Sequence, residues 1–287
     1  VEGDAAVESG VARVGAAPAP GRFPLLVFSH GSAGSRVQFA SVNEVLASHG
    51  FVVAAPDHPG DTMAEHAQGR QGDLIELAGH RQLDVSAVIT ALTEGHDPLA
   101  RSVRADRVGV LGFSFGGLTA VSATVGLPHA PADRRVKAVV AVAPATEVLP
   151  AELLAQVQVP VLLIGGTHDP VTPLGRNAAR AFDQLTRARP RVLVTVAGAT
   201  HNSFTDVCEQ AEAIAAEPAV SVRLQVRIRG TADLTCCPPM IRPSRARDIV
   251  AYHTVLFLAC YLDGDGCGDG YPEHPREFPE AAVTAVS

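Results

Sequence analysis

The chain has 287 residues, of which 47% are hydrophobic and 18% charged, which excludes a disordered protein and is typical of a globular domain with a large core. Its formal net charge of −7 gives no basic surface for nucleic acid, so no nucleic-acid partner is expected. The longest apolar candidate for a membrane span, residues 250–262, is interrupted by His253, so no span is predicted.

The first 22 residues are small, acidic and proline-rich, and we expect them to form a surface loop. They begin at Val1, without an initiator methionine or an apolar signal segment, which indicates a processed or truncated form. We expect residues 23–287 to form a single domain.

From residue 23 onward, segments of strand and helix character alternate, which predicts an α/β fold with a mostly parallel sheet and helices on both faces. The expected strands cover residues 25–30, 51–56, 108–113, 136–143, 159–164 and 191–196. The expected helices cover residues 42–49, 80–93, 118–125, 178–186 and 245–261, the last with Ser244 as its N-cap. Residues 202–244 are less regular and are predicted to be an insertion, with a helical piece at 204–216 and a strand-like piece at 220–228.

A Gly-x-Ser-x-Gly turn links the strand at 108–113 to the helix that follows it. Gly112 and Gly116 permit a sharp turn in which a Cβ would collide with the chain, so the turn pushes the Ser114 side chain outward. The amide of Phe115 is then free at the start of the helix, where it can donate to a developing oxyanion. A glycine-rich turn with an incidental serine is the alternative, but the apolar flanks favour Ser114 as a nucleophile.

A serine nucleophile needs a histidine to take its proton, and that histidine needs a carboxylate to orient it. Reactive groups in open parallel sheets gather beyond the carboxyl ends of the strands. Asp169 follows the strand at 159–164 and His201 follows the strand at 191–196, so we predict them to be the acid and the base. The alternatives are a turn-forming aspartate and an ordinary loop histidine. His168 is a rival base, but a side chain next to Asp169 in sequence is poorly placed to be held by it.

The turn after the first strand supplies a candidate for a second oxyanion donor. The His30-Gly31 pair lets the backbone turn tightly, and we assign the second donor to the amide of Ser32, with a plain surface turn as the alternative. Phe113 and Phe204 are candidates for an apolar wall that binds substrate, with core packing as the alternative.

All five cysteines lie after residue 200, and none shows the Cys-x-x-Cys spacing of a zinc site. Cys260 could form a disulfide with Cys267, and Cys208 with Cys236 or Cys237, whereas reduced, buried cysteines are the alternative. The disulfide interpretation favours a secreted or periplasmic protein.

Acidic residues alternate at 263–269 in the manner of a calcium loop. His274 stands where such a loop has its bidentate glutamate, so a solvated turn is expected there. No metal and no cofactor are predicted.

The order Ser114, Asp169, His201, together with the strand pattern, resembles the α/β-hydrolase fold superfamily. The segments Leu-Val-Phe-Ser-His-Gly-Ser-Ala-Gly-Ser, Gly-Phe-Val-Val-Ala-Ala-Pro-Asp-His-Pro-Gly and Arg-Gln-Leu-Asp-Val are similar to its dienelactone-hydrolase-like branch. That branch lies near the platelet-activating-factor acetylhydrolases and the bacterial cutinases and polyester hydrolases. The similarity covers residues 23–202 well and the C-terminal helix loosely.

The chain departs from these relatives in three ways. Ser114 stands where dienelactone hydrolases have cysteine, so lactone specificity is not implied. Polyester hydrolases carry aromatic residues that clamp the substrate, but this chain has no tryptophan and has Ser32 at a position that is often aromatic. The N-terminal strands of the family are not visible before residue 23, which also favours a truncated form of the chain.

The resemblance implies a serine carboxylic-ester hydrolase that works through an acyl-enzyme intermediate. The short connection at 143–159 has no room for a large lid domain, which favours an open cleft for short to medium acyl esters. The alternatives are a cutinase-like polyester hydrolase, an acetylhydrolase of phospholipid-like esters and, from a different class, a catalytically silent binding module. The expected partner is a small-molecule or polymeric ester, and a monomer is favoured.

Overall fold

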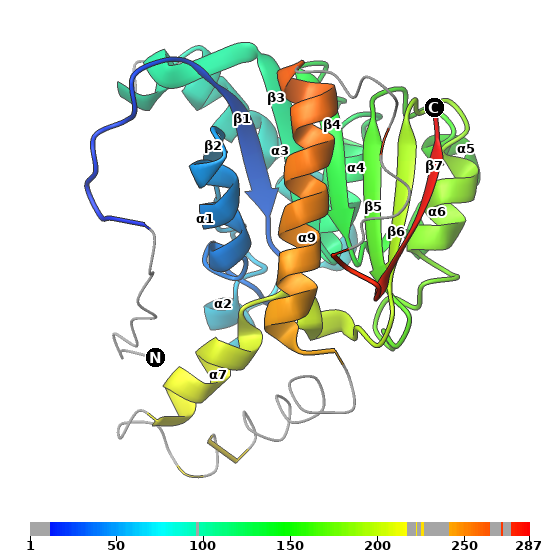
Figure 1. Cartoon of the computed structure of the whole chain (residues 1–287). Helices are drawn as coiled ribbons and strands as arrows, with labels where there is room; N and C mark the ends of the chain where they lie inside the picture. Colours follow the sequence, from blue (N-terminus) through cyan, green and yellow to red (C-terminus); the bar gives the residue numbers. More distant parts are fainter. Residues whose placement is uncertain are drawn as a thin grey trace.

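The computed structural model describes residues 12–95, 98–216, 222, 225–226, 241–264, 271 and 277–287. Within them, seven strands form one sheet in the order β2-β1-β3-β4-β5-β6-β7 (Figure 1). The strands from β1 to β6 pair in parallel, and β7 pairs antiparallel with β6. The expected α/β fold with a mostly parallel sheet is therefore confirmed.

All six expected strands are present, and one further strand was not expected. The strands are β1 (Phe23–Ser29), β2 (Val52–Ala54), β3 (Val103–Phe113), β4 (Val136–Val142), β5 (Val161–Gly166), β6 (Arg191–Val196) and β7 (Ala281–Val286). The unexpected strand, β7, is short and forms the edge of the sheet beyond β6. The residues of β6 with which it pairs are 85 or more positions away in sequence, so no hairpin turn in the sequence predicts this pairing.

The expected helices are present with shifts at their ends, and two short helices, α2 and α5, were not expected. They are α1 (Ala40–Ser48), α2 (Met63–Ala67), α3 (Leu74–Thr93), α4 (Phe115–Ser122), α5 (Ala151–Leu154), α6 (Ala178–Gln184), α7 (Val207–Ala216) and α9 (Pro243–Leu258). The expected cap at Ser244 is wrong, because α9 begins earlier, with Arg242 as N-cap and Pro243 in the first turn. Proline suits that position since its missing N–H would have no partner there.

Helices cover both faces of the sheet (Figure 1). The core on one face includes side chains from α1 and α9, and the core on the other includes side chains from α3, α4, α5 and α6. Within β1, Leu26 and Phe28 point to the first core, whereas Leu25 and Val27 point to the second. Burial on both faces explains why the strands are almost continuously apolar.

The predicted insertion at 202–244 is helical where it is described. It begins with a 3₁₀ turn, η3 (His201–Phe204), and continues with α7. Val222, Gln225 and Val226 are helical, so the strand expected at 220–228 is wrong at these positions.

Between β4 and β5 the chain forms only the short 3₁₀ turn η2 (Thr146–Val148) and α5. No large lid is therefore found in the described part of the chain. In the same ranges, no helix combines the length and apolar character needed to cross a membrane.

Cys260 lies in the π-helical turn η4 (Ala259–Asp263) after α9 and is disulfide-bonded. The side chains of the other four cysteines lie outside the described residues, so the pairings with Cys267 and of Cys208 remain predictions.

Candidate active site

Ser114 occupies a strained turn between the end of β3 and the start of α4. Its backbone has φ 56° and ψ −116°, a conformation that L-residues rarely adopt. The turn is possible because the residues two positions before and two positions after Ser114 are glycines. A Cβ at Gly112 would lie 1.9 Å from the carbonyl oxygen of Gly116. A Cβ at Gly116 would lie 1.8 Å from the carbonyl oxygen of Ser29. The two glycines therefore have the steric role expected from the sequence.

His201 begins the η3 turn just beyond the end of β6 and faces Ser114. Its Nε2 lies 2.9 Å from the Oγ of Ser114, within hydrogen-bond distance. The imidazole packs at 4.8 Å between ring centroids against Phe113, which fixes the plane of the ring. The turn itself is held by a capping box between Thr200 and Ser203.

Asp169 follows β5 and holds the other side of the imidazole. The Nδ1 of His201 lies 2.8 Å from Oδ2 of Asp169, so the ring donates from Nδ1 and is free to accept the serine proton at Nε2. The second carboxylate oxygen, Oδ1, accepts hydrogen bonds of 2.8 Å from the amides of Val171 and Thr172. Asp169 therefore both closes a turn and orients His201.

The carboxyl group of Asp169 is ionised in this setting. Burial acts to raise its pKa, but the hydrogen bond and charge of His201, with the bonds from Thr172, outweigh burial and hold the pKa below its usual value. An ionised carboxylate beside Nδ1 stabilises the imidazolium that forms when Nε2 takes a proton.

The loop after β1 (residues 30–33), which carries the amide of Ser32, lies next to Ser114. A Cβ at Gly31 would lie 3.3 Å from the Cβ of Ser114, so this loop packs directly against the serine. Among the described residues, neither the amide of Ser32 nor that of Phe115 donates a hydrogen bond. Two unpaired amides beside a serine are the arrangement that an oxyanion hole requires.

The expectation that Phe113 and Phe204 form a wall for substrate is wrong. Phe113 is 2% exposed and lies beneath the His201 ring, and Phe204 has no exposed surface. Both belong to the core on the α1 and α9 side of the sheet. Both side chains pack in the core beneath the site, as in the alternative of core packing given for them from the sequence.

The rival base His168 and Asp263, the first residue of the possible calcium loop, have partners other than Ser114. His168 is exposed and has its Nδ1 2.9 Å from the hydroxyl of Thr167. Asp263, at the start of the acidic loop, forms an ion pair of 2.7 Å with Arg104. The rest of that loop, residues 265–269, lies outside the described residues, and no group of metal-binding side chains is found within the described ones.

A second serine–histidine–aspartate chain lies behind the loop of residues 30–33, here called the oxyanion loop because it carries the predicted Ser32 donor, and it was not foreseen. The Oγ of Ser29 lies 2.9 Å from Nε2 of His58, whose Nδ1 lies 2.8 Å from Oδ2 of Asp84. Ser29 and His58 have no exposed surface, so no substrate can reach this serine. Burial, followed by the charge of Arg81, lowers the pKa of His58 even though Asp84 opposes the shift, so the ring is a neutral structural partner.

Three further polar residues at the site were missed from sequence. Thr172 contacts both Asp169 and His201, and a buried ion pair of Asp61 with Arg81 contacts the oxyanion loop. A usable signal exists for Arg81: it lies on the same face of α3 as Leu77 and Val85, both buried. A charged residue in an apolar stripe requires a buried partner of opposite charge.

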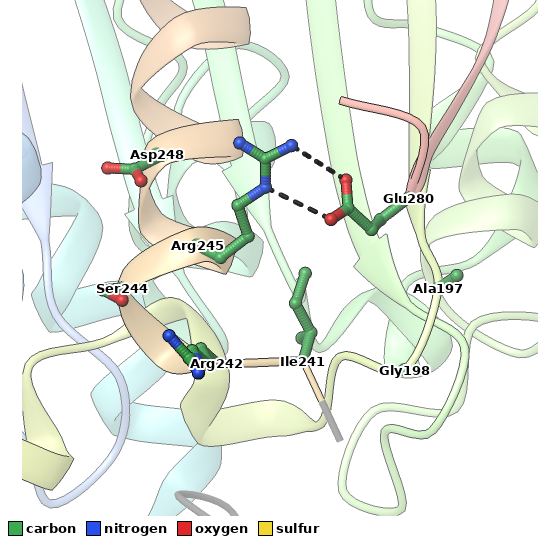
Figure 2. A pocket seen from close by; sticks show the side chains of 8 residues that line it. All are labelled: Ala197, Gly198, Ile241, Arg242, Ser244, Arg245, Asp248 and Glu280. Atoms are coloured by element: carbon green, nitrogen blue, oxygen red, sulfur yellow. Dashed lines mark hydrogen bonds and ion pairs between the residues drawn. The ribbon is translucent and has the colours of Figure 1, made fainter. Parts of the chain in front are cut away.

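A hollow of about 700 Å³ lies elsewhere, between the first turns of α9 and the segments flanking β6 and β7. Figure 2 shows Arg245 and Glu280 facing each other across it, joined by an ion pair of 3.1 Å. Arg242 and Asp248 also line this hollow, but none of the predicted site residues does. It is therefore separate from the Ser114 site.

Residues 16–220 match the family described as PETase, PET hydrolase-like. This match covers more than half of the 287 residues. The chain belongs to the PET hydrolase-like family. The matched range contains Ser114, Asp169 and His201 and ends before α9.

Two relatives place the PET hydrolase-like chain among esterases. It is 20% identical over 224 residues to a platelet-activating factor acetylhydrolase from Bos taurus, a match that covers 64% of this chain and 48% of that protein. The chain thus spans about half the length of this relative. A solved ferulic acid esterase from Streptomyces cinnamoneus is 26% identical with a TM-score of 0.68, covering 95% of this chain and 76% of the esterase. Together with the family match, these likenesses show that the chain has the α/β-hydrolase fold.

Proposed function

We propose that the protein is a serine carboxylic-ester hydrolase that works through an acyl-enzyme intermediate. The observation that carries the proposal is the continuous hydrogen-bond chain from the Ser114 hydroxyl through both nitrogens of His201 to Asp169, with distances of 2.9 and 2.8 Å. This order of nucleophile, base and orienting acid supplies what acyl transfer needs at neutral pH.

In the first half of the reaction, Ser114 Oγ attacks the ester carbonyl while Nε2 of His201 takes its proton. The carbonyl oxygen becomes an anion that accepts hydrogen bonds from the amides of Ser32 and Phe115. When the tetrahedral species collapses, the bond to the alcohol oxygen breaks and His201 returns the proton to that oxygen. The alcohol leaves, and the acyl group stays on Ser114.

In the second half, a water molecule replaces the alcohol. His201 takes a proton from the water as its oxygen attacks the acyl carbon, and the same two amides hold the anion. Collapse breaks the bond to Ser114 Oγ, which regains its proton from His201, and the carboxylic acid is released. Asp169 stays ionised throughout and holds the imidazole in one orientation.

Short to medium acyl esters fit the surroundings of Ser114 best. The segments that follow β2, β4 and β5 carry the exposed apolar side chains Met63, at the start of α2, Val148, at the end of η2, and Val171. In a parallel sheet these segments share an edge with Ser114, so an apolar acyl or alcohol group finds contacts there. The family match and this apolar edge also support a second candidate, an aromatic polyester, and the acetylhydrolase relative supports phospholipid-like acetyl esters as a third.

A rate profile tests the proposal and separates these candidates. Hydrolysis of p-nitrophenyl esters from acetate to decanoate, a feruloyl ester and a polyester film would be measured with wild type and with Ser114→Ala. Ser122→Ala is a matched control, because Ser122 lies in α4 and bonds only within that helix. We expect turnover that is lost in Ser114→Ala and kept in Ser122→Ala. No turnover of any ester by the wild type would favour a silent binding module.

The bonded state of Cys260 supports the further proposal that the protein works outside the cytoplasm. Counting alkylatable thiols with and without reductant in protein purified from its native host tests this. All five cysteines alkylated without reductant would overturn it.

A further inference from the structure

A buried ion pair lies behind the oxyanion loop. Arg81, on α3, and Asp61, before α2, both have fully buried side chains, and Nη1 of Arg81 lies 2.5 Å from Oδ2 of Asp61. Taking two charges out of water is costly, and apolar residues of similar volume often stabilise a fold equally well. Stability alone therefore does not explain why the pair is buried at this place.

Both partners contact the backbone on either side of the Ser32 amide. Arg81 Nη2 donates to the carbonyl of His30, and Oδ1 of Asp61 accepts from the amide of Ala33 at 3.2 Å. The same oxygen accepts the hydroxyl of Ser32 at 2.8 Å. Ala33 has φ 54°, a left-handed conformation that disfavours a residue with a Cβ, so these bonds hold a loop that would not take this shape alone.

The same guanidinium also touches the segment that carries the other oxyanion donor. Arg81 lies over the ring of Phe115, with Cζ 4.7 Å from the ring centroid. Its Nε lies 3.4 Å from the hydroxyl of Thr119, which in turn donates to the carbonyl of Phe115 at 3.1 Å. One side chain therefore contacts both backbone segments that present an amide to Ser114.

We propose that the Asp61–Arg81 ion pair is the positioning element of the oxyanion hole, holding the amides of Ser32 and Phe115 in a fixed relation beside Ser114. The carboxylate of Asp61 is saturated in this role, since it also accepts from Nε2 of His66 on α2 at 2.8 Å. Although burial alone would raise the pKa of Asp61, the charge of Arg81 and the surrounding hydrogen bonds lower it, so the pair is ionised at neutral pH.

The proposal rests on the proposed ester hydrolysis and makes a distinct kinetic prediction. Asp61→Asn keeps the size of the side chain but removes its charge. Because the oxyanion exists only in the transition state, we expect kcat for p-nitrophenyl butyrate to fall roughly 10- to 100-fold while KM changes less than about 2-fold. Affinity for a trifluoromethyl ketone, which forms a tetrahedral adduct on Ser114, is expected to fall in parallel with kcat/KM.

A milder variant guards against loss of folding. Ser32→Ala removes one contact with Asp61 but keeps the backbone amide, and Ser32 is on the surface. We expect kcat to fall about 3- to 10-fold, in the same direction as in Asp61→Asn.

Asp133→Asn is the matched control. Asp133 is also a buried carboxylate, paired with Arg135 at 2.7 Å, but it precedes β4 at the opposite end of the sheet from Ser114. We expect this variant to lower Tm without changing kcat. If Asp61→Asn and Ser32→Ala behave in the same way as Asp133→Asn, the ion pair is merely structural and the proposal is overturned.

A measurement without turnover separates this inference from the proposed function. In ¹H–¹⁵N spectra, the amide signals of Ser32 and Phe115 are expected to shift in Asp61→Asn and to stay in place in Asp133→Asn. Unchanged signals in Asp61→Asn overturn the positioning role even in an active enzyme. If the wild type hydrolyses no ester, the proposed function fails. The amide signals then still show whether the Asp61–Arg81 ion pair positions the amides of Ser32 and Phe115.

Discussion

The hydroxyl of Thr172 lies 2.8 Å from Oδ2 of Asp169, the same carboxylate oxygen that accepts from His201. Thr172 is buried, and its amide donates to the other oxygen of Asp169 at 2.8 Å. The two bonds hold the carboxylate against rotation, so Thr172 is a positioning residue for the acid.

Thr172→Val removes the hydroxyl with almost no change in volume. We expect kcat to fall about 5-fold, the equivalent of one hydrogen bond of about 1 kcal/mol, as measured by steady-state ester hydrolysis. Thr146→Val is the control, because the Thr146 hydroxyl is buried and has no hydrogen-bond partner among the residues that the structure describes, and it should leave kcat unchanged. Equal rates for wild type and Thr172→Val would show that the carboxylate is held without this hydroxyl.

Gly116→Ala tests the steric basis of the turn at Ser114. A methyl group there would meet the Ser29 carbonyl oxygen at 1.8 Å, so the backbones of β1 and α4 must separate. We expect the free energy of unfolding to fall by about 3 kcal/mol or more, measured by urea denaturation, with loss of activity.

Gly175→Ala is the control for this substitution, since nothing lies within 4 Å of a Cβ at that position. It should change the free energy of unfolding by less than about 0.5 kcal/mol. A Gly116→Ala protein as stable and active as Gly175→Ala would contradict the geometry described for the turn.

Three buried histidines, His30, His58 and His253, have lowered pKa values, which makes stability depend on pH. Burial lowers the pKa of His253 from 6.5 to about 4, and burial together with the charge of Arg81 lowers that of His30 to about 4. Between these values the unfolded chain binds protons that the folded protein does not, so stability is complete above pH 6.5 and falls as the pH falls towards 4. Each histidine contributes a slope of at most about 1.4 kcal/mol per pH unit.

His253→Gln is expected to flatten this dependence, measured as the free energy of unfolding between pH 7 and pH 4.5. Within the described part of the chain, Nε2 of His253 is buried and has no hydrogen-bond partner, so protonation of this ring in the folded protein is disfavoured. A slope identical to that of the wild type would show that His253 takes up its proton equally in both states.

The parts of the site that follow strands could be predicted from the sequence. Ser114, Asp169 and His201 each come directly after an apolar strand, and parallel strands bring such positions to one edge. The Gly-x-Ser-x-Gly spacing also has a steric reason, since a Cβ at Gly112 or at Gly116 would collide with a backbone carbonyl oxygen. Local sequence and sheet topology were sufficient for these residues.

Contacts that depend on side-chain packing could not be predicted in the same way. The sequence does not show whether the side chains of Phe113 and Phe204 point into the core or to the surface. In the structure both are buried. The role of Arg81 depends on Asp61 and on the loop after β1, which come together only in the folded sheet. The edge strand β7 lacks any local signal because its partner is distant in sequence.

The most direct test of the account is active-site labelling with a fluorophosphonate, followed by mass spectrometry of the peptide that contains Ser114. The account predicts one adduct per chain on Ser114, with labelling abolished in Ser114→Ala and strongly slowed in a folded His201→Ala protein. Labelling that persists in Ser114→Ala, or an adduct on any other residue of the wild type, would contradict it.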